Sequence, residues 1–161
     1  MRLIAGLRIA LIALALVGVA ACSSKNKPDV AGTAAAVPGS ERDFITNVGD
    51  RVQFLIDQST LTPDAQNILR RQATWMRQYG QVTVQIEGHA DERGTREYNI
   101  ALSARRAERV KNFLIAQGIS ASRVATIAFG KERPVSLCDA ESCWSKNRRA
   151  VTVITGGAVS G

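Results

Sequence analysis

From about residue 44 onward, segments whose hydrophobic residues repeat every second position are interspersed with segments whose hydrophobic residues repeat with the longer period of helices. This pattern limits the chain to folds that combine strands and helices. The predicted strands cover residues 52–56, 82–87, 124–129 and 150–155. The predicted helices cover residues 62–79 and 95–117. This order of elements predicts an α/β fold, a small two-layer sandwich with about four strands in one sheet and two main helices on one face.

The first predicted helix has clear ends and one apolar stripe. Thr62 is placed to cap its N-terminus, Pro63 suits its first turn, and Gly80 suits its end. The stripe consists of Ala65, Ile68, Leu69, Trp75, Met76 and Tyr79. Trp75 is therefore interpreted as a core residue. Helical connections favour parallel pairing of the strands that they join, while the pattern leaves the full strand order open.

The N-terminus has the pattern of a lipoprotein signal. Arg2 and Arg8 come before an apolar, uncharged run at residues 9–21. This run is too short for a typical membrane-spanning helix. The run ends in Val-Ala-Ala before Cys22, which resembles the lipobox of bacterial lipoproteins, where the cysteine is acylated. Ser23 follows instead of Asp, and by the same resemblance this favours the outer membrane. The alternative is an ordinary secretory signal with a chance cysteine.

These features divide the chain into three expected parts. Residues 1–21 form the signal peptide, residues 22–43 the lipidated N-terminus and flexible tether, and residues 44–161 the globular domain. Residues 25–40 lack aromatic residues and any clear period, as a flexible tether does. We expect the lipid to hold the chain at the outer membrane, with the domain facing the periplasm.

The cysteine count fits an exported protein with one lipidated cysteine. Of three cysteines, acylation of Cys22 leaves Cys138 and Cys143 as a candidate disulfide that closes a small loop. A metal site would need more ligands, and the chain's only histidine, His89, lies far away in sequence. We expect no metal and no cofactor, and we interpret His89 as a loop residue that packs or forms a hydrogen bond.

The charge is basic without being selective. Removal of residues 1–21 with their two arginines lowers the formal charge from +7 to +5. A basic surface suits anionic lipid, an anionic polymer or nucleic acid, but no basic run interleaved with aromatic residues points to nucleic acid. Arg148 and Arg149 are interpreted as a solvated pair without an assigned role.

The second predicted helix carries a cation on its core-facing stripe. Leu102, Val110, Phe113 and Leu114 share one face at 100° per residue, and Asn99, Ser103 and Arg106 fall on the same face. A buried arginine needs a partner, and Asp91 in the preceding loop is the expected one. Two interpretations stay open: a structural ion pair, or a polar pocket that offers both charge signs to a zwitterionic ligand.

Three segments together carry a family signature. The loop at 88–95 reads Gly-His-Ala-Asp-Glu-Arg-Gly-Thr, and the segment at 146–151 reads Lys-Asn-Arg-Arg-Ala-Val. The pattern Asn-x-x-Leu-Ser-x-x-Arg-Ala-x-x-Val is met at Asn99, Leu102, Ser103, Arg106, Ala107 and Val110. Over about residues 48–155, the chain resembles the OmpA-like peptidoglycan-binding domains.

The resemblance implies a ligand and residue roles. The ligand would be the diaminopimelate of the peptidoglycan stem peptide, with Asp91 meeting its ammonium, Arg106 its carboxylate, and Leu102 forming a pocket wall. Backbone groups at 56–58 would complete the site. Lipoproteins of this family often have Phe-x-Phe-Asp-Lys here, whereas this chain has Phe-Leu-Ile-Asp-Gln at 54–58, so that Asp57 alone of the last three is kept.

The same resemblance implies a cellular role and partners. The protein would tether the outer membrane to the cell wall non-covalently and would support envelope integrity and cell division. Its partners would be peptidoglycan and the Tol system, with the periplasmic protein TolB using a surface that overlaps the ligand site.

Two other classes of function are alternatives for this sequence. A peptidoglycan glycosidase needs carboxylates on both sides of a bond, and Asp91 and Glu92 are adjacent in one loop. An amidase would need zinc ligands or a cysteine–histidine pair, and the chain has one histidine. We therefore expect no enzyme activity. The second alternative is a lipoprotein that acts only by binding other proteins.

Overall fold

The computed structural model of the chain describes residues 35–160. The predicted signal peptide, the lipidation site Cys22 and most of the predicted tether lie outside these residues. None of the helices within them is both long enough and apolar enough to cross a membrane.

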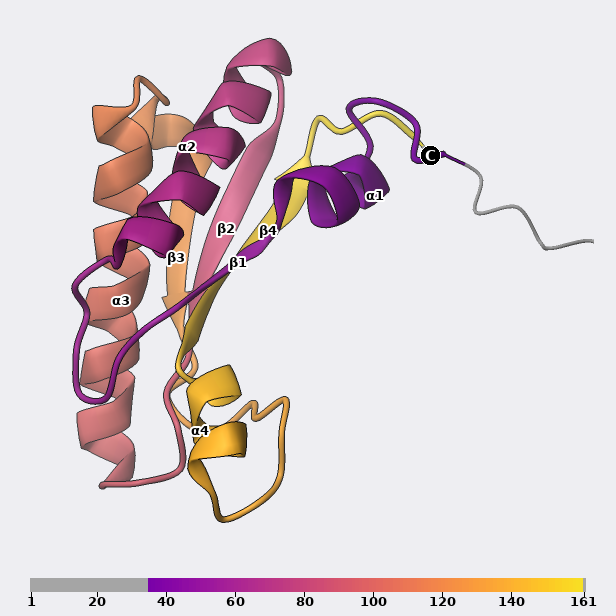
Figure 1. Ribbon diagram of the computed structural model, residues 1–161. Coiled ribbons are helices and arrows are strands. Elements are labelled where there is room, and N and C mark those ends of the chain that lie inside the picture. Colours follow the sequence, from indigo (N-terminus) through magenta and orange to yellow (C-terminus); the bar gives the residue numbers. More distant parts are fainter. Residues whose placement is uncertain (1–34, 161) are drawn as a thin grey trace, which may run out of the picture. The chain divides into compact units, whose positions relative to one another are not determined.

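The described residues form one four-stranded sheet with helices packed against it (Figure 1). The strands are β1 (Arg51–Gln53), β2 (Thr83–Gly88), β3 (Val124–Ala128) and β4 (Arg149–Gly156), and their order is β1-β4-β2-β3. β2 and β3 are parallel, as their helical connection predicts, whereas β4 pairs antiparallel with both β1 and β2. The predicted α/β sandwich is thus confirmed, but β4 separates β1 from β2, which the helical connection alone would have paired.

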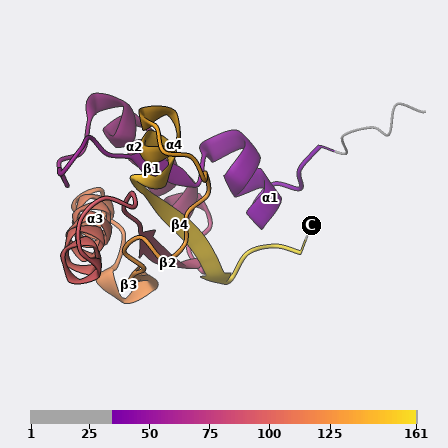
Figure 2. The ribbon, with the colours of Figure 1, turned by 90° about the horizontal axis from the view of Figure 1, so that it is seen from below.

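Two long helices cover one face of the sheet. They are α2 (Pro63–Gln78) and α3 (Arg96–Ala116), and the view from below shows them on the same side of the strands (Figures 1 and 2). Each begins where a threonine accepts a hydrogen bond from the first turn: Thr62 from the Ala65 N–H, and Thr95 from the Tyr98 N–H. These caps fix where each apolar stripe meets the sheet.

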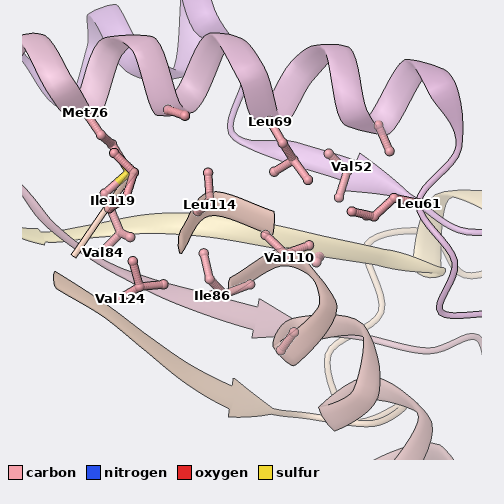
Figure 3. Packing of buried hydrophobic residues seen from close by; sticks show 14 of the residues in the cluster. Val52, Leu61, Leu69, Met76, Val84, Ile86, Val110, Leu114, Ile119 and Val124 are labelled. Carbon is pink, nitrogen blue, oxygen red and sulfur yellow. The ribbon is translucent and has the colours of Figure 1, made fainter. Parts of the chain in front are cut away.

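The core lies between the helices and the sheet (Figure 3). α2 contributes Leu69 and Met76, α3 contributes Val110 and Leu114, and β2 contributes Ile86, all at most 1% exposed. Trp75, at 6% exposed, belongs to this core, as predicted. Burying this apolar surface is the main favourable contribution to folding.

The first strand is shorter than its alternating pattern predicts. β1 ends at Gln53, and Leu55 and Ile56 are more than half exposed. The backbone then turns sharply at Asp57, whose φ of 56° is left-handed. The chain leaves the sheet here, and the carbonyls of Leu55 and Gln58 accept hydrogen bonds from Arg106 of α3.

The folded part of the chain begins before residue 44. Helix α1 (Glu41–Asp43) leads into a π-helical turn at Phe44–Val48. The Asp43 carboxylate accepts from the Trp75 indole at 2.8 Å and from the Gly39 N–H at 2.9 Å. Residues 39–43 therefore pack on the domain, although composition placed them in the tether.

A fourth helix, α4 (Glu141–Asn147), lies in the stretch that the sequence pattern leaves irregular. It directly precedes β4 and sits at the opposite end of that strand from α1 (Figure 1). A disulfide joins Cys138 to Cys143, in the first turn of α4. The helix was missed because seven residues show too little periodicity.

The packing of α3 on β2 makes a test of this fold. A Cβ at Gly88 would lie 2.0 Å from the Ser103 carbonyl oxygen, so Gly88→Ala must push α3 off the sheet. We expect the free energy of unfolding to fall by about 3 kcal/mol in chemical denaturation. Gly80→Ala is the matched control, because its Cβ would meet nothing within 4 Å. Equal stability of the two variants would contradict the packing.

Candidate functional site

A hollow of about 300 Å³ opens beside the C-terminal end of β2. Three parts of the chain surround it: the turn after β1, the loop after β2 with the first half of α3, and the residue that links α4 to β4. Its lining consists of Ile56, Asp57, Asp91, Arg93, Gly94, Tyr98, Asn99, Leu102, Arg106 and Arg148. Five of the six residues predicted for a ligand site are thus brought together, and Ser103 is not.

Arg106 is the most completely buried cation of the hollow. Its side chain is fully buried, and its Nε, Nη1 and Nη2 donate to the carbonyls of Gln58, His89 and Leu55 at 2.9, 2.9 and 3.1 Å. Burial lowers its pKa to about 10, so it stays charged at neutral pH. The predicted contact with Asp91 is wrong: backbone carbonyls hold Arg106, and Asp91 pairs with other arginines.

Asp91 is the buried anion of the same hollow. It is 7% exposed and accepts from Arg93 Nη2 at 2.5 Å, from the Arg93 N–H at 3.2 Å and from Arg148 Nη1 at 3.2 Å. Burial by itself would raise the pKa of Asp91, but the hydrogen bonds from Arg93 and Arg148 outweigh it and lower that pKa below its usual value. Asp91 is therefore ionised at neutral pH and held in one orientation.

Arg148 is a site residue that sequence reasoning missed. We expected Arg148 and Arg149 to be solvated, yet they are 4% and 5% exposed. Arg148 donates to the Phe54 carbonyl at 3.1 Å and to both Asp91 and Glu141, and thus joins β1 to the loop after β2. The signal available for it was the match of residues 146–151 to the family pattern, which periodicity cannot supply.

The other predicted residues divide between lining and support. Leu102, at 5% exposed, forms an apolar wall, and Asn99 holds the loop by donating to the Arg93 carbonyl at 2.8 Å. Asp57 accepts from the Tyr98 hydroxyl at the rim. Ser103 instead points into the protein, where its hydroxyl accepts from the Gly130 N–H at 2.9 Å. This bond joins α3 to the loop after β3, to which Gly130 belongs.

His89 lies behind the hollow and is 1% exposed. Its carbonyl accepts from Arg106, and its ring stacks on Phe129 with centroids 5.5 Å apart. Burial, together with the charges of Arg149 and Arg133, lowers the pKa of His89 from 6.5 to about 4. Among residues 35–160, no three His, Cys, Asp or Glu side chains gather as metal ligands would.

A second, larger hollow of about 560 Å³ adjoins the first at Arg148. Its walls include Phe54, Leu55 and Ile68. Of the buried charged residues, only Arg148 lines it, whereas Asp91, Arg106 and Arg148 all line the first. Because fixed, desolvated charges are what a small polar ligand requires, the smaller hollow is the candidate site.

The sequence is similar to those of known proteins. Residues 53–148 match the model of the OmpA family. A peptidoglycan-associated lipoprotein of Mesorhizobium japonicum is 52% identical over 149 residues, which cover 89% of each chain. One of Brucella melitensis is 51% identical over 165 residues, which cover 97% of this chain and 98% of the relative.

Solved structures match the fold as well. The crystal structure of the peptidoglycan-associated lipoprotein from Burkholderia pseudomallei has a TM-score of 0.67 at 33% identity, and covers 71% of this chain and 98% of its own. The C-terminal domain of Helicobacter pylori MotB has a TM-score of 0.62 at 21% identity, over 66% of this chain and 84% of its own, which shows a shared fold alone.

The buried His89 predicts an acid-sensitive stability. Its pKa is lower in the folded state than in the unfolded state, so its contribution is complete above pH 6.5 and is lost as the pH falls toward 4. We expect denaturation at pH 7 and pH 4.5 to show a loss of up to about 2 kcal/mol that His89→Phe removes. Asp91 contributes little to this difference, since the hydrogen bonds from Arg93 and Arg148 lower its pKa from a usual value that already lies below pH 4.5. An unchanged pH dependence in His89→Phe would contradict this.

Proposed function

This chain belongs to the OmpA family and, within it, to the peptidoglycan-associated lipoproteins, and we propose that its domain binds peptidoglycan without cleaving it. The ligand is the diaminopimelate residue of the stem peptide. Its free end carries an ammonium and a carboxylate on one carbon, so it presents both charges within a short distance.

One observation carries this proposal: the hollow holds a buried cation without a contacting anion next to a buried, ionised carboxylate. Arg106 is fully buried, and among residues 35–160 its three hydrogen-bond acceptors are neutral carbonyls. A buried charge of this kind gains strongly from an anionic partner. The ligand's carboxylate supplies that partner, while Asp91 meets the ammonium.

The bonding of Arg106 leaves N–H donors that a carboxylate could use. A guanidinium has five N–H donors, one on Nε and two on each terminal nitrogen. The carbonyls of Gln58, His89 and Leu55 take one from each nitrogen. One N–H on Nη1 and one on Nη2 remain, and this pair suits the two oxygens of a carboxylate.

The charges in the hollow favour binding over hydrolysis. A glycosidase needs one carboxylic acid whose pKa is raised so that it can donate a proton. Asp91 has the opposite property, because Arg93 and Arg148 hold its pKa down. Release of soluble fragments from purified cell wall would contradict a purely binding role.

The cellular role follows from the anchor and the ligand together. Cys22, acylated and held in the outer membrane, would place the domain in the periplasm within reach of the cell wall. The protein would tether the outer membrane to peptidoglycan, together with TolB and the other Tol proteins, and would support envelope integrity and cell division. The TolB surface would overlap the ligand hollow, so the two partners would compete.

Binding is tested with variants that keep the shape of the site. Charge-assisted hydrogen bonds contribute about 1.5–3 kcal/mol each, so Asp91→Asn and Arg106→Lys should weaken sedimentation of the purified protein with peptidoglycan by about tenfold or more. Lysine cannot reproduce the planar fork. Free diaminopimelate should compete with the wild-type protein. Arg105→Ala, an exposed neighbour on α3, is the control and should bind normally.

Thermal melts separate binding from folding in these variants. Arg106→Ala would leave three buried carbonyls unpaired, so its failure to bind would also follow from a loss of structure. Folded Asp91→Asn and Arg106→Lys proteins that bind as well as Arg105→Ala would rule out the hollow as the ligand site.

The lipid anchor has its own test. We expect Cys22→Ser to move the protein from the detergent phase to the aqueous phase, since each buried acyl methylene contributes about 0.8 kcal/mol to membrane binding. Mass spectrometry of the mature wild-type protein should show an acylated Cys22. An unmodified cysteine in membrane-associated protein would refute the anchor.

A further inference from the structure

Helix α4 forms a wall beside the ligand hollow. Glu141, Trp144 and Arg148 follow one another at i, i+3 and i+7, which places them on one side of the helix. All three contact residues of the site loop: the Trp144 indole donates to Glu92 at 2.8 Å, and the Arg93 guanidinium carbon lies 4.2 Å from the Trp144 ring centroid. The position of α4 therefore bears directly on the charged groups around Asp91.

Glu141 shares with Asp91 the two arginines that hold it. Arg148 donates to Asp91 through Nη1 and to Glu141 through both terminal nitrogens. Arg93 Nη2 lies 2.5 Å from Asp91 and 4.0 Å from Glu141. Glu141 does not line the hollow, so it acts on a ligand without touching it, through these arginines and through its own charge.

Little within α4 itself keeps Glu141 in place. The helix has seven residues, and its N-cap, Ala140, offers no side chain to the first turn. The disulfide between Cys138 and Cys143 ties the preceding loop to that turn, while Asn147 and the Trp144 contacts with Glu92 and Arg93 fasten the rest of the helix. The Asn147 side chain accepts from the N–H groups of Val135 and Ser136 and donates to the Ser136 carbonyl.

We propose that Glu141, fixed by the Cys138–Cys143 disulfide, is a positioning residue that keeps Asp91 available to the ammonium of the ligand. This role rests on the proposed binding of a zwitterionic amino-acid group. Glu141 forms ion pairs with Arg93 and Arg148, the same arginines that pair with Asp91. Because the two carboxylates share these arginines, Arg93 and Arg148 do not neutralise Asp91 completely.

The charge balance around the hollow gives the physical reason. Arg93, Arg106 and Arg148 face Asp57, Asp91 and Glu141, and the Glu92 charge also acts on Arg93. Removing the Glu141 charge makes this cluster more positive by one unit. Arg93 and Arg148 then pair with Asp91 alone, and an incoming ammonium meets a more positive site. Coulombic repulsion of this kind weakens binding even when the fold is unchanged.

The first experiment changes the charge alone. We expect Glu141→Gln to weaken binding of the purified protein to peptidoglycan by roughly three- to tenfold without lowering its melting temperature, as the pair is partly exposed. Glu141→Asp, which keeps the charge, should restore most of the binding. Glu108→Gln removes the same charge from the far side of α3, where Glu108 accepts from Thr126, and should bind normally.

The second experiment releases α4 by reduction. A dithiol supplies two electrons and two protons, which convert the Cys138–Cys143 bond into two thiols while the dithiol becomes a cyclic disulfide. We expect hydrogen exchange of the amides at 141–148 to accelerate, while that of β2 and β4 stays slow. Binding should weaken as in Glu141→Gln, and the two changes should not add. Cys138→Ser/Cys143→Ser should bind weakly with or without the dithiol.

The outcomes separate this role from the proposed function. Normal binding by Glu141→Gln, or failure of Glu141→Asp to restore it, overturns the positioning role while the wild-type protein still binds. Unchanged exchange of α4 after reduction overturns the part of the disulfide. If the oxidised wild-type protein does not bind peptidoglycan at all, the proposed function fails and the positioning role fails with it.

Discussion

The buried guanidinium of Arg106 is the interaction on which the shape of the site depends. It binds carbonyls of Leu55, Gln58 and His89, which belong to two loops more than 30 residues apart in sequence. To present those carbonyls, the chain must leave β1 after Gln53 and turn through the left-handed Asp57. The hydrogen bonds of Arg106 thus hold the end of β1 and the turn at Asp57 in place, and the same side chain lines the hollow.

A buried cation held only by neutral groups is costly, and that cost has a functional consequence. The carbonyls satisfy three N–H groups but leave the net charge unmatched by any contacting carboxylate of residues 35–160. Asp91 does not close this gap, because Arg93 and Arg148 already hold it. Both the stability of the fold and the affinity for the ligand therefore depend on Arg106. This is why a substitution there must be judged by folding and by binding separately.

Periodicity predicted what repeats along the chain, and missed what depends on backbone acceptors or on very short elements. The helices, the Trp75 core position and the anomalous Arg106 follow from spacing and residue type. The partners of Arg106 do not follow from them, because every residue has a backbone carbonyl and the sequence does not show which of them accept a hydrogen bond. β4 lies between β1 and β2, and Arg148 is buried, because both contact segments that are distant in the sequence. The periodicity of one helix or strand does not predict such contacts.

The site is assembled from both ends of the domain, so it exists only when the whole sheet is complete. The Arg148 side chain reaches the Phe54 carbonyl across 94 residues, and β4, which begins directly after it, lies between β1 and β2. Any chain that lacks the last strand loses the partner of β1, and Arg148 loses the strand that holds it beside Phe54 and Asp91. Loss of β4 from the sheet would therefore abolish the ligand hollow. Binding of a ligand to that hollow should in turn stabilise the pairing of the central strand, because a ligand that binds only the folded state favours that state.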